Sequence, residues 1–307
     1  MRILVSGASG FVGSAVCRRL RDRCDDVERL VRGGGDGVLW DPKTGRFGSL
    51  AADGADAVVH LAGENVFSGR WNEERKAAIR DSRVAGTRLL AEGLARLKRP
   101  PRVIVCASAV GFYGKGGDTE QSEEEPPGRG FLAEVCRDWE SACAPAVERG
   151  IRVANLRIGL VLSTQGGALR MMLPAFRLGL GGRIGDGRQW INWITLGDLV
   201  RVVEHVLEDD ALAGPVNAVA PHAVRNGEFT HVLARVLGRP AVLPVPAVVL
   251  RLALGEIADE LLLSGTRAVP KRLSERGFRF EHPHIEPALR ALLARKQEEA
   301  RGVRRGP

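Results

Sequence analysis

The sequence predicts an α/β fold in which helices cover both faces of a doubly wound parallel sheet, with a smaller lobe formed by the second half of the chain. Short apolar runs alternate with longer amphipathic stretches through the first half of the 307 residues, which is the pattern of parallel strands joined by crossover helices. Three closely spaced glycines and a helical pattern follow the first run directly. A chain of this length also exceeds the usual size of a single core, so a second lobe is expected.

Strands are expected where short apolar runs end in turn residues, and helices where Leu, Val and Ala recur with helical spacing. The expected strands are residues 3–6, 27–31, 57–61, 103–107, 153–156 and 215–218. The expected helices between them are residues 13–21, 73–97 and 132–148. The glycine-rich segments 33–37 and 179–187 are expected to be loops, and Pro244 and Pro246 mark a break before an apolar helix at 247–254.

The less regular second half indicates two structural units. The larger one is expected to comprise residues 1–165 and 190–220. The smaller lobe comprises 166–189 and 221–298 and would face the carboxyl ends of the strands, where sheets of this kind bind ligands. Residues 299–307 are expected to be a tail. A basic run from Arg295 to Arg305, which also contains Glu298 and Glu299, has a composition typical of a solvated end.

The composition narrows the classes of partner. The formal net charge of +8 favours anionic ligands, but the arginines are scattered and aromatic residues make up only 5%, so we expect no nucleic acid. Five cysteines without a CxxC pair predict neither a disulfide framework nor a metal site. The sequence shows no signal peptide and no spanning apolar run, so we expect a cytoplasmic protein without a membrane partner, as a monomer or homodimer that binds a small molecule.

The segment from Val5 to Gly13 reads VSGASGFVG and lies between the first strand and the first helix. Gly7 permits a tight turn, Gly10 lets the backbone approach a pyrophosphate, and Gly13 allows close packing of helix on strand. The N–H groups at the helix start can then bind phosphate. The GxxGxxG spacing is weak alone, but this position makes it specific for a Rossmann-type dinucleotide site; a turn without a ligand is the alternative. The expected contacts are Gly7, Ser9, Gly10, Phe11, Val12 and Gly13.

The end of the second strand indicates which dinucleotide is bound. Many such sites carry an acid there for the ribose hydroxyls, but this strand ends Val31-Arg32. A guanidinium suits a 2′-phosphate, so the sequence predicts NADP(H); an exposed strand-end arginine is the alternative. At the end of the third strand, Leu61, Ala62 and Gly63 would bring small backbone groups against the cofactor, whereas His60 is expected to be a packing residue.

The motifs GASGFVG, HLAGEN, SAVGFYG, FLAEVCRDWE, LRIGLVL and WITLGDL resemble an atypical branch of the extended short-chain dehydrogenase/reductases, the epimerase-family proteins of the NAD-dependent epimerase/dehydratase type. The segment 243–293 resembles the C-terminal module of that branch. The resemblance implies a Rossmann core with NADP(H) across the strand ends. It also implies further cofactor contacts beyond the turn and the second strand, at Leu61, Ala62, Arg83, Ala107, Arg157 and Ile158.

The superfamily normally uses a Ser or Thr, a Tyr, and a Lys four residues later, which lowers the pKa of the phenol. The resemblance places Ser108 at the serine position. The tyrosine and lysine positions fall on Leu132 and Cys136, and neither can do that work. Tyr113, the single tyrosine in the chain, is the remaining acid/base candidate, although Lys115 lies only two residues further on. A substrate contact or a packed phenol is the alternative for Tyr113.

Two functions stay open at this point. The first is an NADP-dependent oxidoreductase or epimerase that acts on a small polar, carbohydrate-like substrate, with Ser108 and Tyr113 as catalytic residues. The second is an NADPH-binding regulatory or interaction protein without turnover, which the missing Tyr-Lys pair would allow. Further polar and aromatic residues in the motifs are expected to be mostly structural; they are Glu64, Asn65, Arg70, Glu134, Asn192, Asp198, Trp71, Trp190 and Trp193.

Overall fold

The computed structural model describes residues 1–33 and 35–303, with side chains described up to Ala294. Its centre is an eight-stranded sheet in the order β12-β8-β6-β5-β1-β2-β3-β4. All neighbouring pairs are parallel except β3 and β4. The strands are β1 (Arg2–Ser6), β2 (Asp26–Val31), β3 (Val38–Asp41), β4 (Arg46–Phe47), β5 (Ala57–His60), β6 (Val103–Ala109), β8 (Arg152–Ile158) and β12 (Gly214–Ala218). This confirms the α/β fold with a doubly wound sheet.

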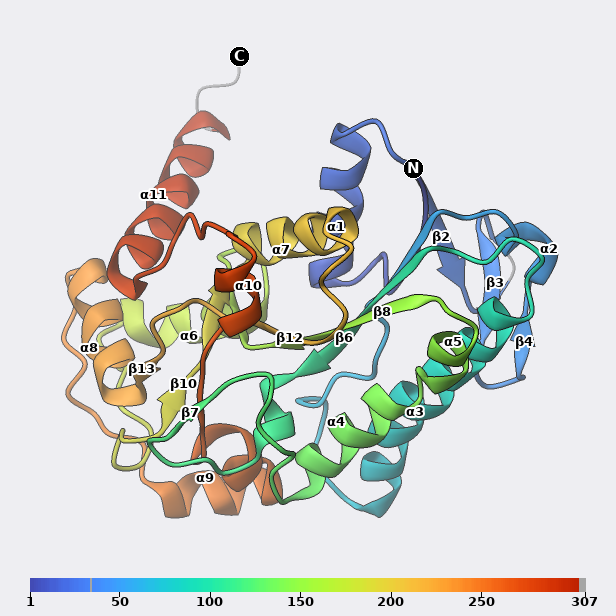
Figure 1. The fold of residues 1–307 in the computed structure, drawn as a ribbon. Helices are drawn as coiled ribbons and strands as arrows, with labels where there is room; N and C mark the ends of the chain where they lie inside the picture. The colour runs from blue at the N-terminus through green and yellow to red at the C-terminus, as the bar shows by residue number, and fades with distance from the viewer. Residues whose placement is uncertain (34, 304–307) are drawn as a thin grey trace.

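Helices cover both faces of the sheet, as Figure 1 shows. On one face, α1 (Phe11–Asp22), α7 (Leu196–Glu208) and α10 (Lys271–Glu275) pack on a core that includes Ile3, Val5 and Val105. On the other face, α2 (Ser49–Ala52), α3 (Glu73–Ala95), α4 (Phe131–Ser141) and α5 (Ala144–Glu148) pack on a core that includes Leu4 and Ile104. The strands are apolar on both faces because each face is covered.

A third core fills the smaller lobe, between α6 (Gly167–Arg177), α8 (Asn226–Leu237) and the start of α11 (Ile285–Val303). Trp193 belongs to this core although the sequence placed it in the larger unit. The lobe also holds α9 (Ala247–Leu254) and the π-helix η2 (Ala258–Leu262). Two two-stranded pairs link the lobe to the larger unit: β10 (Trp190–Ile191) with β13 (Val224–Arg225), and β7 (Glu120–Gln121) with β14 (Arg267–Ala268). A third pair, β9 (Leu160–Leu162) with β11 (Trp193–Thr195), lies within the larger unit.

Two expectations about the elements were wrong. The helix expected at 132–148 is divided into α4 and α5, because Pro145 occupies the first turn of α5 and cannot continue a helix from α4. The strands β3 and β4 were also missed; β4 has only two residues, which are too few for a periodic signal. Helix α9 matches its expected range. Helix α11 continues to Val303 through the first part of the expected tail, and residues 304–307 lie outside the described residues.

The described chain contains neither a candidate membrane span nor a candidate metal site. None of its helices has the length and apolar character needed to cross a bilayer. No three His, Cys, Asp or Glu side chains within the described ranges are grouped so that they could hold a metal ion.

Candidate functional site

The candidate site lies at the carboxyl ends of β1 and β5, where the chain connections diverge. From β1 the sheet continues to β2 on one side, whereas β5, β6 and β8 follow on the other. The two strands are direct neighbours, with Val5 opposite Val59 and Ser6 opposite His60. Crevices at such a switch point are where open parallel sheets bind ligands.

The glycine turn after β1 has the geometry that its sequence predicts. Gly7 adopts a φ of +67°, and a Cβ on it would stand 2.9 Å from the Ala62 nitrogen. A Cβ on Gly13 would stand 2.1 Å from the Gly7 oxygen, so neither position accepts a side chain. Gly10 donates its N–H to the Gly7 oxygen at 2.9 Å and begins α1 without a side-chain cap. The first N–H groups of α1 therefore remain suited to an external phosphate.

A buried chain of hydrogen bonds fixes the turn after β5. Ser6 Oγ accepts from the Leu61 and Ala62 nitrogens at 3.1 and 3.2 Å, so its own proton goes to His60 Nδ1, 2.6 Å away. His60 Nε2 then donates to Thr87 Oγ1 at 3.0 Å. Burial lowers the pKa of His60 to about 4. His60 is thus a neutral packing residue, as expected, and it orients the predicted backbone contacts Leu61 and Ala62.

Arg83, on α3, takes part in no ion pair in the described part of the chain. Its guanidinium lies over Trp139, with 5.1 Å between Cζ and the ring centroid, and NH1 donates to the Ile79 carbonyl at 3.2 Å. A Cβ on Gly63 would stand 3.3 Å from Cζ, which places the guanidinium against the turn after β5. Burial lowers the pKa of Arg83. Because an unpaired, largely buried charge is costly, this position favours an anion from outside the protein.

The remaining predicted cofactor contacts lie at the same edge. Arg32 is exposed directly after β2, and Val31 ends that strand. Phe11 packs against the loop before α6, where a Cβ on Gly166 would stand 2.5 Å from its ring. Ala107 and Ile158 lie near the ends of β6 and β8, with Ala109 opposite Ile158 in the register. The structure gathers these residues at one edge, and their contacts with a cofactor stay predictions.

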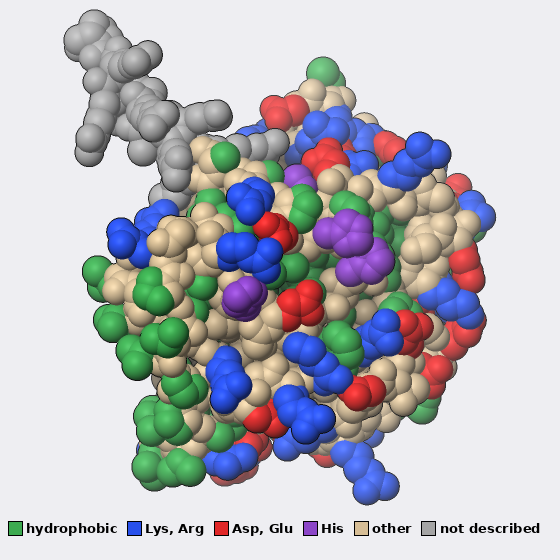
Figure 2. All heavy atoms as spheres, turned by 90° about the vertical axis from the view of Figure 1, so that its left-hand side faces the viewer, with side chains coloured by type: hydrophobic (Ala, Val, Ile, Leu, Met, Phe, Trp, Pro, Cys, Tyr) green, Lys and Arg blue, Asp and Glu red, His purple; other side chains and the backbone are tan. Residues whose placement is uncertain are grey.

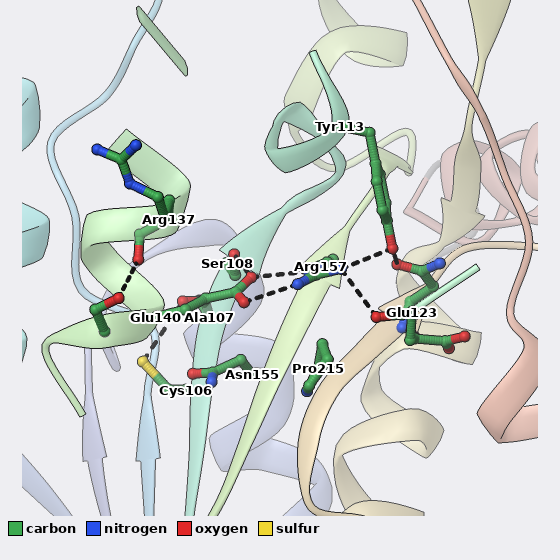
Figure 3. Close-up of polar contacts among 12 residues, drawn as sticks. Cys106, Ala107, Ser108, Tyr113, Glu123, Arg137, Glu140, Asn155, Arg157 and Pro215 are labelled. Atoms are coloured by element: carbon green, nitrogen blue, oxygen red, sulfur yellow. Dashed lines mark hydrogen bonds and ion pairs between the residues drawn. The ribbon is translucent and has the colours of Figure 1, made fainter. Parts of the chain in front are cut away.

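Ser108, Glu140 and Arg157 form a closed polar cluster between β6, α4 and β8 (Figure 3). Ser108 Oγ donates to Glu140 Oε1 at 2.7 Å. Arg157 donates from Nε to Oε1 and from NH2 to Oε2 of Glu140, both at 2.9 Å. Burial opposes the charge on the guanidinium, but the hydrogen bonds and charge of Glu140 outweigh it and raise the pKa of Arg157. This ion pair is bidentate and largely desolvated.

Tyr113 extends the cluster toward the smaller lobe. Its hydroxyl accepts from Arg157 NH1 at 2.9 Å and has two acceptors for its single proton, Asn217 Oδ1 at 2.7 Å and the Ser122 carbonyl at 2.9 Å. Burial raises the pKa of Tyr113, with Arg157 acting in the opposite direction. Glu123, buried beside it, accepts from the Asn217 nitrogen at 3.0 Å, and burial raises the pKa of Glu123. The phenol is therefore saturated by protein partners.

These contacts bear directly on the two predicted catalytic residues. Ser108 and Tyr113 are both 3% exposed, and each hydroxyl is used inside the network. Arg157 is likewise committed to Glu140 and Tyr113 rather than presented to a ligand. Ser108 points to α4, on the same face as Cys106, because side chains alternate along a strand. The network gives all three residues a structural task, and their catalytic and cofactor roles stay predictions.

The positions of the missing Tyr-Lys pair are apolar or neutral. Leu132 is partly buried and packs with Trp71 and Ile257. Cys136 is buried, and burial raises the pKa of its thiol to about 12, so it stays protonated and cannot replace a lysine. Lys115 is exposed. Glu260 of η2 accepts from the Leu132 nitrogen at 3.3 Å, which joins the C-terminal module to the start of α4.

Several other polar candidates have structural partners. Asn192 bridges the Thr266 carbonyl and the Ala268 nitrogen at 2.8 and 2.9 Å. Asp198 accepts from the Glu281 and His282 nitrogens. The residues that the sequence did not single out are Glu123, Glu140 and Asn217. Their types are common, and only packing brings them to Tyr113 and Arg157, so nothing in the sequence alone marks them.

Comparisons with known proteins agree with this geometry. Residues 3–219 match the model of the NAD dependent epimerase/dehydratase family. The chain belongs to that family. A second match, at residues 245–292, is to a domain of unknown function, DUF1731, which covers α9, η2 and α10. The chain is 42% identical over 290 residues to the epimerase family protein Mb2239 of Mycobacterium bovis. The match covers 94% of this chain and 96% of that protein.

Two solved structures extend the likeness to three dimensions. One is the crystal structure of human epimerase family protein SDR39U1 with NADPH, whose sequence is 34% identical to this chain. The two structures match with a TM-score of 0.88, and the match covers 95% of this chain and 99% of the human chain. A nucleoside-diphosphate sugar epimerase from Corynebacterium glutamicum is 36% identical with a TM-score of 0.78, covering 96% of this chain and 60% of that one.

Proposed function

We propose that this chain binds NADP(H) at the carboxyl ends of β1, β2 and β5, and that it acts as an oxidoreductase or epimerase on a small polar, carbohydrate-like substrate. Two neighbouring features carry the proposal. The start of α1 at Gly10 has no side-chain cap, and the guanidinium of Arg83 forms no ion pair within the described residues. Both sites favour phosphate. One follows β1 and the other lies beside the turn after β5, the neighbouring strand. Arg32 suits the 2′-phosphate that distinguishes NADP(H) from NAD(H).

The relatives support this choice of ligand. The human SDR39U1 crystal structure contains NADPH, and the Corynebacterium glutamicum protein is named as a nucleoside-diphosphate sugar epimerase. NADP(H), when bound, supplies a hydride donor or acceptor. The residues of this chain would hold its phosphates, and the lobe that carries η2 would close the substrate side through Glu260 and the start of α4.

A second candidate function is NADPH binding without turnover. One observation favours it: Leu132 and Cys136 occupy the acid/base positions, and the hydroxyls of Ser108 and Tyr113 are consumed by internal hydrogen bonds. Reduction of a carbonyl requires a proton to accompany the hydride. A protein without a group to supply that proton would retain the cofactor and serve as a sensor or binding partner.

One experiment separates the two functions. Purified protein is titrated with NADPH by fluorescence, and the loaded protein is then incubated with sugar nucleotides and small carbonyl compounds. NADPH absorbance and loss of deuterium from C4-labelled NADPH are followed together. Consumption or label loss with any compound supports the enzyme. Tight binding with neither signal supports the binding protein, and absence of NADPH binding contradicts both.

A further inference from the structure

One face of the smaller lobe, which we term the aliphatic face, is built by the two segments 163–185 and 229–255. The segments lie side by side. Gly185 donates its N–H to the Val245 carbonyl, and Val245 donates to the Arg183 carbonyl, both at 2.9 Å. Helix α6 and the loop after it come from the first segment, and α9 comes from the second. Residues about sixty positions apart thus share one surface.

Large aliphatic side chains gather on this face. Helix α9 has no buried residue, although seven of its eight residues are apolar. In Figure 2, which looks onto this lobe, hydrophobic side chains gather along the left and lower left edge. Six large side chains of the face are between 57% and 74% exposed: Met171, Leu178, Leu180, Val242, Val248 and Leu252. Scattered single apolar residues on a surface need no explanation, whereas a group of large ones on one face favours an interaction site.

The charges on the aliphatic face have one sign. Neither segment contains an Asp or Glu, although the chain has 37 acidic residues. Arg235 and Arg251 pair with acids outside the two segments, at 3.2 and 3.0 Å. Four more arginines of the face take part in no ion pair within the described residues: Arg170, Arg177, Arg183 and Arg239. The face therefore combines exposed aliphatic groups with uncompensated guanidinium groups.

We propose that the aliphatic face docks the protein onto an anionic lipid surface. Leu and Val side chains gain by entering the boundary of the acyl chains, while arginines beside them bind the phosphate groups of the lipids. A second copy of the chain fits less well, because a two-fold contact would set the unpaired arginines of the face against their own copies. The sequence predicted no membrane partner, since hydropathy along the chain detects spanning segments and cannot detect a face assembled from two separate ones.

The test uses the full chain in flotation assays with vesicles. We expect binding to phosphatidylcholine vesicles that contain phosphatidylglycerol, and much weaker binding to phosphatidylcholine alone. Leu252→Asp should weaken binding at least about tenfold, because it places a charge in the acyl boundary. Arg177→Ala should weaken it about fivefold on anionic vesicles, and added salt should reduce this difference. Leu50→Asp is the matched control, because Leu50 is 95% exposed on α2, away from this face. This variant should bind anionic vesicles as well as the unmodified protein does.

Three outcomes would overturn the proposal. The first is absence of binding to anionic vesicles by the folded protein. The second is unchanged binding to anionic vesicles by both Leu252→Asp and Met171→Asp, when circular dichroism shows that both variants have the native fold. The third is a dimer in sedimentation experiments that Leu252→Asp dissociates, without vesicle binding, which would assign the face to a second copy. NADPH affinity should be unchanged in all variants, so this test is independent of the proposed function.

Discussion

The carboxylate of Glu140 on α4 and the guanidinium of Arg157 on β8 form two parallel hydrogen bonds of 2.9 Å. The Glu140 side chain is 12% exposed and that of Arg157 is 4% exposed. Ser108 and Tyr113 each bond to one member of the pair. The ion pair therefore links a helix to two strands and holds both hydroxyls in place.

Replacing Glu140 by Gln should destabilise the fold by about 3 kcal/mol, since it leaves the Arg157 charge buried without a partner. Urea unfolding at neutral pH measures the loss. Glu134→Gln is the matched control, because Glu134 is on the same helix and pairs with Arg80 at 3.4 Å with 53% of its side chain exposed. That surface pair should contribute less than about 1 kcal/mol. Equal effects of the two substitutions would show that the buried pair has no special weight.

Ser108→Ala and Tyr113→Phe should each cost about 1–2 kcal/mol of stability, because each removes a buried hydrogen bond to a charged partner. NADPH affinity should not change. In a turnover assay both variants should retain most of the activity. Removal of an acid/base residue would instead lower turnover by about 10²- to 10⁴-fold. Unchanged stability with such a loss of turnover would instead assign the hydroxyls to catalysis.

Gly10→Val should abolish NADPH binding while the protein stays folded. In the protein itself a Cβ on Gly10 meets only the Gly7 oxygen, at 3.1 Å, but it would occupy the space through which a pyrophosphate reaches the N–H groups of α1. Fluorescence titration measures affinity, and thermal unfolding confirms the fold. Gly197→Ala in α7 is the control, because its added Cβ would stand 3.9 Å from Thr195 Oγ1. This variant should bind NADPH with normal affinity. Unchanged NADPH affinity in folded Gly10→Val would exclude the glycine turn as the phosphate site.

Arg32 and Arg83 should differ in how they affect cofactor choice. Arg32→Ala should weaken NADPH by about ten- to a hundredfold and leave NADH unchanged, because charged hydrogen bonds of roughly 1.5–3 kcal/mol form only with the 2′-phosphate. Arg83→Ala should weaken both dinucleotides, because its position beside Gly63 favours a phosphate that both share. Calorimetry on both ligands measures the four affinities. Equal NADPH and NADH affinities in the unmodified protein would contradict the Arg32 assignment.

His60 should make stability depend on pH in the acid range. Its pKa is about 4 in the folded protein, below its ordinary value of 6.5, so the unfolded chain binds a proton first as the pH falls. Stability is then lost between about pH 6.5 and pH 4, by about 3 kcal/mol in total. His60→Asn should be less stable at neutral pH but should lack this component of the pH slope. Parallel slopes for the two proteins, measured by urea unfolding from pH 7 to pH 4, would show that folding does not lower the pKa of His60.

The features that sequence reasoning predicted are those that depend on nearby residues. The turn from Gly7 to Gly13 is defined by backbone geometry over seven positions, because only glycine tolerates the close approach of Gly13 to the Gly7 oxygen. The switch from apolar runs to helical spacing is equally local, and it predicted the strands β1, β2, β5, β6, β8 and β12 and the helices α1, α3 and α9. It failed at α4 and α5, where one proline divides the pattern.

The sequence by itself determined the doubly wound sheet, the position of the glycine turn after β1 and the family to which the chain belongs. The tertiary structure alone decided which groups the hydroxyls of Ser108 and Tyr113 contact. Their partners Glu140 and Asn217 are 32 and 104 positions away, and no spacing rule connects residues so far apart. The aliphatic face was decided in the same way, because α6 and α9 become one surface only when the loops after α6 and α8 run together. Local patterns report backbone geometry, whereas the partners of a polar side chain depend on how distant elements pack.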